Sequence, residues 1–224
     1  MKLAKNIIAS SVALGILLSG TASIAGPSKV SVTGKLAGKL ISLNRIEKKQ
    51  EKDFRKYRQI RPINIKETFK RRNRMQNVEW ANEILIPNLD DYSFENVIIA
   101  LADESLKRAG LSDNGKTYKF EISKLKVSNH SLVILSGITT YVKGRVIEMD
   151  ENTGKELRSV DVTTNVSMNY SVDWSYDGPD FAFNETDAES RFGPVMVNFI
   201  SKGLGKLNPN AVFPKPISIT YGRL

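Results

Sequence analysis

Residues 140–172 contain the pattern that most restricts the fold, a short turn between two stretches of β-forming residues. The turn, residues 150–154, reads Asp-Glu-Asn-Thr-Gly and is typical of a hairpin loop. Residues 140–149 are rich in β-branched and aromatic side chains, with Gly144 at a bulge or close approach. Residues 155–172 alternate in polarity, so one face of a long, bent return strand is apolar. The pattern predicts an antiparallel hairpin with one buried face.

Two amphipathic helices are predicted, one on each side of the strands. The first begins at Phe94 after the capping residue Ser93, and it ends before Gly110. The second opens with a capping-box pattern at residues 186–189. The dipeptide Gly193-Pro194 predicts a kink or a late start in it, and Gly203 or Gly205 its end.

Further strands are predicted at residues 118–127, with a bulge, at residues 131–138 and at residues 217–221. Short connections between the first strands favour an antiparallel meander. We therefore expect an α+β fold, with an antiparallel sheet of three to five strands and two helices packed on one face. A basic N-terminal arm precedes it, in which residues 30–41 are expected to form one strand.

Residues 90–207 combine a helix that ends at Gly110, a hairpin with the 150–154 loop, and a second helix over 188–204. In this combination the chain resembles small α+β envelope domains of Gram-negative bacteria, such as the YajG-type lipoproteins. The resemblance implies an accessory or binding role in the envelope, and it carries over no catalytic residues. Those lipoproteins have a lipobox Cys where this chain has Thr21, so lipid anchoring is not implied.

The first 25 residues predict a secretory signal peptide that is cleaved near Ala25. Lys2 and Lys5 precede an apolar run over residues 7–18, which is shorter than the roughly 20 residues of a spanning helix. We therefore expect a periplasmic or envelope-associated mature protein, with an uncleaved anchor as the alternative. The complete absence of cysteine excludes disulfides and fits an oxidising compartment.

The positive charge of the chain is concentrated in one segment. The whole chain has 33 Lys and Arg against 24 Asp and Glu, a net charge of +9. Residues 45–74 alone carry 13 basic and four acidic side chains, also +9, so the rest of the mature chain is slightly acidic. The predicted organisation is a signal peptide at 1–25, an arm at 26–77 with the basic segment 45–74, an α+β domain at 78–207, and a Pro-containing tail at 208–224.

The basic segment is a candidate for binding an anionic surface or partner. The candidate residues are Lys66, Lys70, Arg71, Arg72 and Arg74. For an exported protein the partners are an envelope protein or an anionic envelope polymer, such as lipid head groups or lipopolysaccharide, with peripheral membrane contact. Nucleic acid is not expected, because the compartment is wrong and no nucleic-acid fold signature is present. The alternative is a solvated connector.

Residues 173–187 form an acidic and aromatic segment that predicts a loop. Its candidate ligand-binding or partner-binding residues are Trp174, Tyr176, Asp177, Asp180 and Phe181. One alternative is a loop whose aromatic rings pack over the sheet edge; others are a hard-cation site and a carboxylate pair that cleaves glycosides. No phosphate-cradling glycine loop or cofactor motif is present, so we expect no cofactor, no metal and no catalytic residue. His130 is expected in an exposed turn.

These observations lead to the hypothesis of a non-enzymatic, exported envelope protein with a binding or accessory role. Its basic arm contacts an anionic surface or partner. Two alternatives remain open, a subunit of a surface or secretion assembly and an enzyme that acts on wall or sugar polymers through the 173–187 loop. The ligand and the oligomeric state are left open by the sequence.

Overall fold

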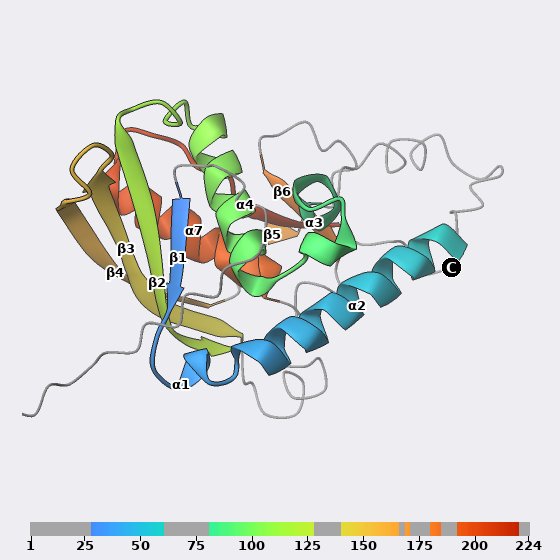
Figure 1. The fold of residues 1–224 in the computed structure, drawn as a ribbon. Coiled ribbons are helices and arrows are strands. Elements are labelled where there is room, and N and C mark those ends of the chain that lie inside the picture. The colour runs from blue at the N-terminus through green and yellow to red at the C-terminus, as the bar shows by residue number, and fades with distance from the viewer. Residues whose placement is uncertain are drawn as a thin grey trace, which may run out of the picture.

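The computed structural model in Figure 1 describes residues 28–60, 81–127, 140–165, 169–170, 180–184 and 192–219. The predicted signal peptide, the apolar run at 131–138 and His130 lie outside these residues. The elements in chain order are β1 (Ser28–Val32), α1 (Gly34–Ala37), α2 (Leu40–Ile60), α3 (Ala81–Leu85), η2 (Leu89–Asp91), α4 (Phe94–Arg108), β2 (Lys116–Lys126), β3 (Tyr141–Asp150), β4 (Glu156–Asn165), β5 (Asn169–Tyr170), β6 (Phe181–Asn184), α7 (Gly193–Leu207) and β7 (Pro216–Ile219).

The larger sheet has four strands in the order β1-β2-β3-β4. The three strands from β2 to β4 form the predicted antiparallel meander, with a register shift in β2 after Ile122. The predicted hairpin turn is confirmed: the N–H of Gly154 donates to the carbonyl of Asp150 at 2.9 Å, and the N–H of Thr153 donates to its carboxylate at 2.7 Å. Gly154 has a φ of +65°, a conformation that a side chain would strain.

One face of this sheet is buried under helices α4 and α7, which lie on the same side of it in Figure 1. The buried side chains on this face include Tyr118, Phe120, Ile122, Val142, Val146, Glu148 and Val162. Helix α7 lies so close to β3 that a Cβ on Gly203 would overlap the side chain of Val146. The fold is therefore α+β, as predicted, with the core between the sheet and these helices.

Helix α4 has the bounds that the sequence predicts. The hydroxyl of Ser93 accepts a hydrogen bond from the N–H of Asn96 at 3.1 Å, and Gly110 follows the helix with a φ of +70°. Helix α7 begins at Gly193 with Pro194 in its first turn, which confirms the late start. Its predicted end is wrong, because the helix continues past Gly203 to Leu207.

A second, small sheet has the order β5-β7-β6, and all its pairs are parallel. It corrects two predictions. The return strand does not continue to residue 172, because β4 ends at Asn165 and residues 169–170 pair with β7 instead. Residues 181–184 are a strand and not part of a loop. Strand β7 itself confirms the short strand expected near the C-terminus.

The segment predicted as an N-terminal arm is partly built into the domain. Strand β1 pairs in parallel with β2, so residues 28–32 form an edge of the larger sheet. The expectation of one strand over residues 30–41 is wrong, because α1 and the start of α2 follow β1 within this stretch. The basic segment from residue 45 to residue 60 belongs to α2, and its continuation over residues 61–74 lies outside the described residues.

Candidate anionic-surface site

The long helix α2 is attached to the domain through a polar face. Glu51 is completely buried there, and Glu47 is nearly so. The Nε of Arg55 donates to the carboxylate of Glu51 at 2.7 Å, and the side-chain amide of Asn82 donates to its other oxygen at 3.3 Å. Because a buried carboxylate is strongly destabilising without partners, these contacts are a requirement for α2 to lie where it does.

Arg55 also connects α2 to the end of α3. Its guanidinium donates to the carbonyls of Pro87 at 2.6 Å, Ile86 at 2.7 Å and Asn82 at 3.1 Å. The carbonyl of Asn82 also accepts a hydrogen bond from the N–H of Ile86 at 3.2 Å, whereas Ile86 and Pro87 follow the last residue of α3, where a cation is a favourable cap for carbonyls. One arginine thus neutralises a buried acid and caps a neighbouring helix.

The first half of α2 is attached at the start of α4. The side-chain carbonyl of Asn44 accepts a hydrogen bond from the N–H of Phe94 at 2.7 Å. The ammonium of Lys48 lies 3.4 Å from the carboxylate of Asp90; the Asp90 side chain is largely exposed and that of Lys48 partly so. The second contact contributes little on its own because water screens it. Together with Arg55, these contacts determine which side of α2 faces the domain.

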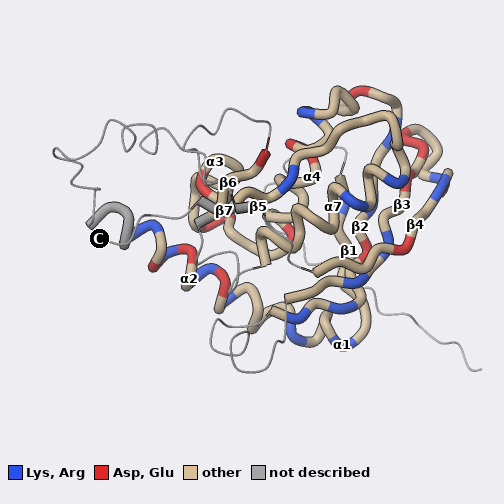
Figure 2. The backbone as a smooth tube through the Cα atoms, turned by 180° about the vertical axis from the view of Figure 1, so that it is seen from behind, with Lys and Arg blue, Asp and Glu red and all other residues tan. Residues whose placement is uncertain are grey.

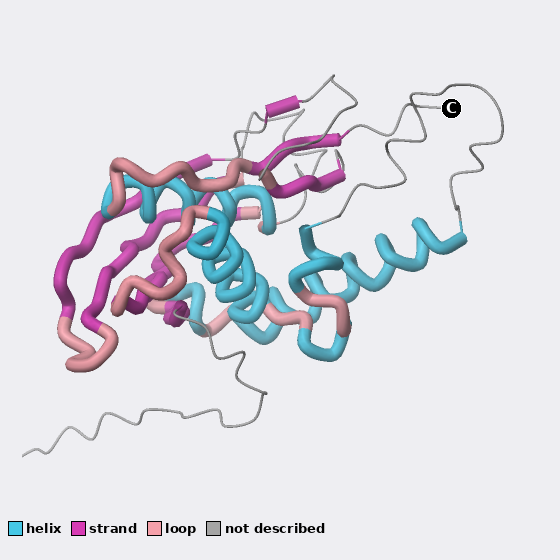
Figure 3. Tube along the Cα trace, turned by 90° about the horizontal axis from the view of Figure 1, so that it is seen from above, coloured by secondary structure: helices cyan, strands magenta, loops and turns pink. Residues whose placement is uncertain are grey.

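An exposed side of α2 is basic. Arg45, Lys49, Lys52 and Lys56 are all exposed, and we call these four residues the basic face. At 100° per residue they fall within an arc of about 60°. Figure 2 shows the alternation of basic and acidic residues along α2, and Figures 1 and 3 show its C-terminal part extending beyond α3.

The exposed side of α2 is basic because two glutamates of the helix face the domain instead of solvent. Between residues 40 and 56 the helix contains Glu47, Glu51 and Asp53, and only Asp53 is exposed. In sequence the three acids are interspersed among six bases, so periodicity alone does not reveal which side is charged. The polar spacing of Glu47, Glu51 and Arg55 at i, i+4 and i+8 is the signal that could have indicated it.

Most of the predicted site residues lie outside the described part of the chain. This applies to Lys66, Lys70, Arg71, Arg72 and Arg74 of the basic segment. It applies equally to Trp174, Tyr176 and Asp177 of the acidic and aromatic segment. The structure thus brings together a different part of the basic segment, the basic face of α2.

Asp180 and Phe181 are described, and both have structural contacts. The carboxylate of Asp180 accepts a hydrogen bond from the N–H of Lys215 at 2.7 Å, next to β7. Phe181 is only 2% exposed, and the guanidinium of Arg108 lies 4.6 Å from its ring centroid. The prediction that Phe181 offers its ring to a ligand or partner is therefore corrected, because the second sheet draws it into the core.

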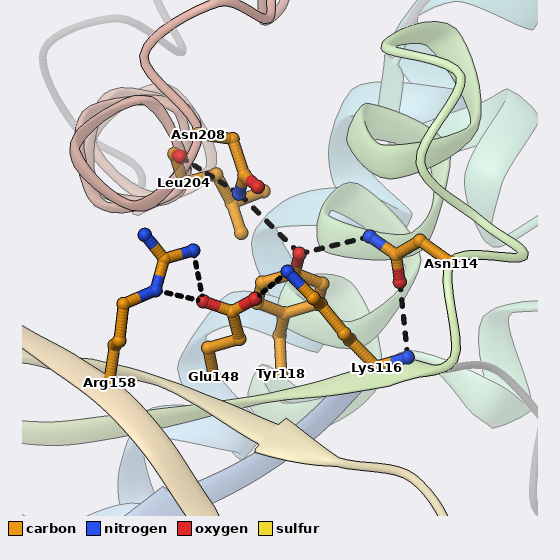
Figure 4. Close-up of polar contacts among 7 residues, drawn as sticks. All are labelled: Asn114, Lys116, Tyr118, Glu148, Arg158, Leu204 and Asn208. Atoms are coloured by element: carbon orange, nitrogen blue, oxygen red, sulfur yellow. Dashed lines mark hydrogen bonds and ion pairs between the residues drawn. The ribbon is translucent and has the colours of Figure 1, made fainter.

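A second polar cluster lies at the other end of the domain (Figure 4). Glu148 of β3 is completely buried between Lys116 of β2 and Arg158 of β4, and forms an ion pair with each. The Nε of Arg158 donates to Glu148 at 2.7 Å. Both cations are partly exposed, so the cluster connects three strands at the sheet surface.

The same cluster reaches the end of α7 through Tyr118. The phenol oxygen of this buried residue accepts hydrogen bonds from the side-chain amides of Asn114 at 3.2 Å and Asn208 at 3.4 Å. The amide of Asn208 also donates to the carbonyl of Leu204, in the last turn of α7, at 3.2 Å. All these groups are engaged in holding strands and helix together, so the cluster is structural.

Asp103 of α4 is the third carboxylate of note. Burial raises its pKa, and hydrogen bonding from Ser28 of β1 opposes only part of this effect. Asp103 therefore disfavours the folded state at neutral pH, in contrast to the two clusters above. In the described part of the chain, no three His, Asp or Glu side chains gather closely enough to hold a metal ion.

Comparison with known proteins adds no family. No protein-family model, no curated protein and no solved structure matches the chain, so the resemblance to the YajG-type envelope domains stays a prediction. Within the described residues, none of the helices has the length and apolar character needed to cross a membrane.

Proposed function

We propose that this chain is an exported, non-enzymatic envelope protein with a binding or accessory role, held at an anionic surface or partner by its basic segment. The observation that carries the proposal is the sorting of charge on α2. Both glutamates on the side facing the domain are buried, and the four side chains of the basic face are exposed.

The basic face produces a local electrostatic field. Four cations along one side of a helix produce a positive potential that attracts polyanions over about 10 Å at moderate salt. The cations of the predicted residues Lys66, Lys70, Arg71, Arg72 and Arg74 follow in the same segment and add to it. Because exposed charges are screened, the attraction is expected to be reversible by salt.

Fractionation of cells that express the full chain tests this proposal. Membranes are washed at low and at high salt, and the protein and its mature mass are followed. We expect the mass of a mature chain that begins near Gly26. We also expect high salt to release the protein from the membranes. Retention at high salt, or a cytoplasmic location, would contradict the proposal.

Two charge variants sharpen this test. One replaces the basic face with glutamate, and the other replaces Lys70, Arg71, Arg72 and Arg74 with glutamate. We expect each variant to weaken envelope association strongly. The matched control replaces Lys126, Lys143, Lys155 and Lys215, which are exposed elsewhere on the domain, and should stay associated. Equal release of the control would show that total charge matters and not this segment.

A further inference from the structure

The basic face of α2 has an exposed apolar neighbour, Ile41, which is 87% exposed. Resting on the proposed function, we infer that the anionic partner is a lipid bilayer. In this arrangement α2 lies parallel to the membrane surface, the basic face contacts lipid phosphates, and Ile41 inserts among the head groups. The inference adds a specific ligand class and an apolar contact that the proposed function does not contain.

The shape of the face fits a flat partner. Arg45 and Lys56 are separated by about 16 Å along the helix axis, and the four cations form one narrow stripe along it. Together with Ile41 they span an arc of about 80° around the helix. A straight row of charges on a helix edge contacts a plane along its whole length, as helices at membrane interfaces do.

The position of Ile41 distinguishes it from an incidental surface residue. It lies one turn before Arg45, about 20° beyond the edge of the arc of the four cations, while its neighbour Leu40 packs against the core. Ile46, which is half exposed, lies about 60° beyond this arc, on the far side of Asp53. Apolar side chains beside a row of cations are the composition that interfacial helices use to combine insertion with phosphate attraction.

The residue types also favour lipid over a structured anion site. Three of the four cations are lysines, which act as flexible point charges and do not impose the two-pronged geometry of arginine. Lipid phosphates in a fluid bilayer rearrange around such charges. In addition, the contacts of Glu51 and Arg55 already hold α2 in place, so binding requires no folding of the helix.

The experiment measures binding of the purified full chain, with its mass determined, to vesicles by co-sedimentation. One vesicle contains phosphatidylglycerol and phosphatidylcholine in equal parts, and the other contains phosphatidylcholine alone. We expect binding to the anionic vesicle only, and its loss at high salt. Each cation near the membrane surface is expected to raise the partition coefficient about fivefold. Replacing all four residues of the basic face with glutamine should therefore lower this coefficient on the order of several hundredfold. The control variant should change the partition coefficient little. It carries glutamine in place of Lys126, Lys143, Lys155 and Lys215.

Insertion of Ile41 is tested with a dye, because the chain has no cysteine of its own. Ile41→Cys and Val212→Cys each give one labelling position for an environment-sensitive fluorophore; Val212 is 80% exposed but lies far along the chain from α2. We expect a blue shift on anionic vesicles for the label at position 41 and none at position 212. Ile41→Ser should weaken binding several-fold, and Val212→Ser should not.

The outcomes separate the two proposals. Anionic vesicle binding that does not change in the glutamine variant, or an unshifted label at position 41, overturns the lipid inference. If envelope association in cells depends on the basic face but the purified chain ignores anionic vesicles, the proposed function stands and the partner is not lipid. If envelope association is also independent of the basic segment, both proposals fail.

Discussion

Two carboxylates of this domain, Glu51 in α2 and Glu148 in β3, are completely buried, and each forms an ion pair with an arginine. Their surroundings differ. Glu51 is paired with Arg55 of its own helix, and Arg55 also binds the carbonyls that follow α3. Glu148 has two cations, one from each neighbouring strand, and backbone hydrogen bonds already join these strands.

The comparison shows two uses of a buried acid. Around Glu51 the polar contacts attach an element that has a thin apolar stripe, so they decide where α2 lies. Around Glu148 the contacts reinforce a sheet whose position is already determined by its core residues. The first cluster is therefore expected to be sensitive to loss of a single partner, and the second to tolerate it.

The largest effect is expected from Arg55→Met. The substitution removes the Arg55 guanidinium from the buried carboxylate of Glu51 and from the carbonyls of Ile86 and Pro87, while the carbonyl of Asn82 keeps the N–H of Ile86 as a donor. We expect a loss of about 3–5 kcal/mol in the free energy of unfolding. Urea denaturation measures it, and hydrogen exchange should show α2 amides losing protection first. Unchanged α2 protection would mean that apolar packing, and not this cluster, holds the helix.

Loss of one cation at Glu148 should be milder. Lys116→Met and Arg158→Met each leave the other cation in place, so we expect about 1 kcal/mol for each. The double variant should lose about 3 kcal/mol, more than the sum, because Glu148 then has no cation. A double-mutant cycle in urea measures this coupling. Additive losses would show that the two ion pairs are independent and that the comparison with Arg55 does not hold.

The two regions also contain a matched pair of asparagines. Asn44→Ala removes the acceptor of the Phe94 N–H at the start of α4, and we expect a loss of about 1 kcal/mol. Asn208→Ala should cost about 0.5 kcal/mol, because the carbonyl of Leu204 keeps a backbone donor and Tyr118 keeps Asn114. Thermal unfolding of both variants ranks their losses of stability. A larger loss for Asn208→Ala would contradict the view that the remaining partners at the end of α7 compensate for Asn208.

The smallest effect concerns Asp103, a partly buried carboxylate for which the described residues supply no ion pair. Burial raises its pKa above the ordinary 3.8, so the folded state binds the proton more tightly than the unfolded state does. The carboxylate therefore destabilises the fold above its raised pKa, and this effect disappears as the pH falls through that value. Asp103→Asn should raise the melting temperature slightly at neutral pH and not at low pH. A lower melting temperature at neutral pH would show that the charge is stabilising.

The parts of the fold that could be predicted are those with local causes. The bounds of α4 follow from the Ser93 cap and Gly110, and the hairpin follows from the loop that ends in Gly154. Each signal acts within a few residues and does not depend on the rest of the chain. The late start of α7 follows in the same way from Pro194.

The candidate site could be predicted only in part. The sequence located the positive charge in residues 45–74, and the basic face lies within that range. Which cations of α2 are exposed depends on Glu47 and Glu51 turning inward, and that orientation depends on Asn82, Ile86 and Pro87. These partners are some 30 residues away, so no periodicity within α2 could reveal them.

By itself, the sequence determined the antiparallel hairpin, the capped helix, the absence of cysteine and the location of the charge, because each is a property of composition or of neighbouring residues. Only the tertiary structure decided that β1 pairs with β2, that residues 169–170 and 181–184 leave the predicted strand and loop for a second sheet, and that α2 presents its lysines outward. The physical reason is that pairing and burial depend on partners that are distant in the chain, and these partners exist only once the chain has folded.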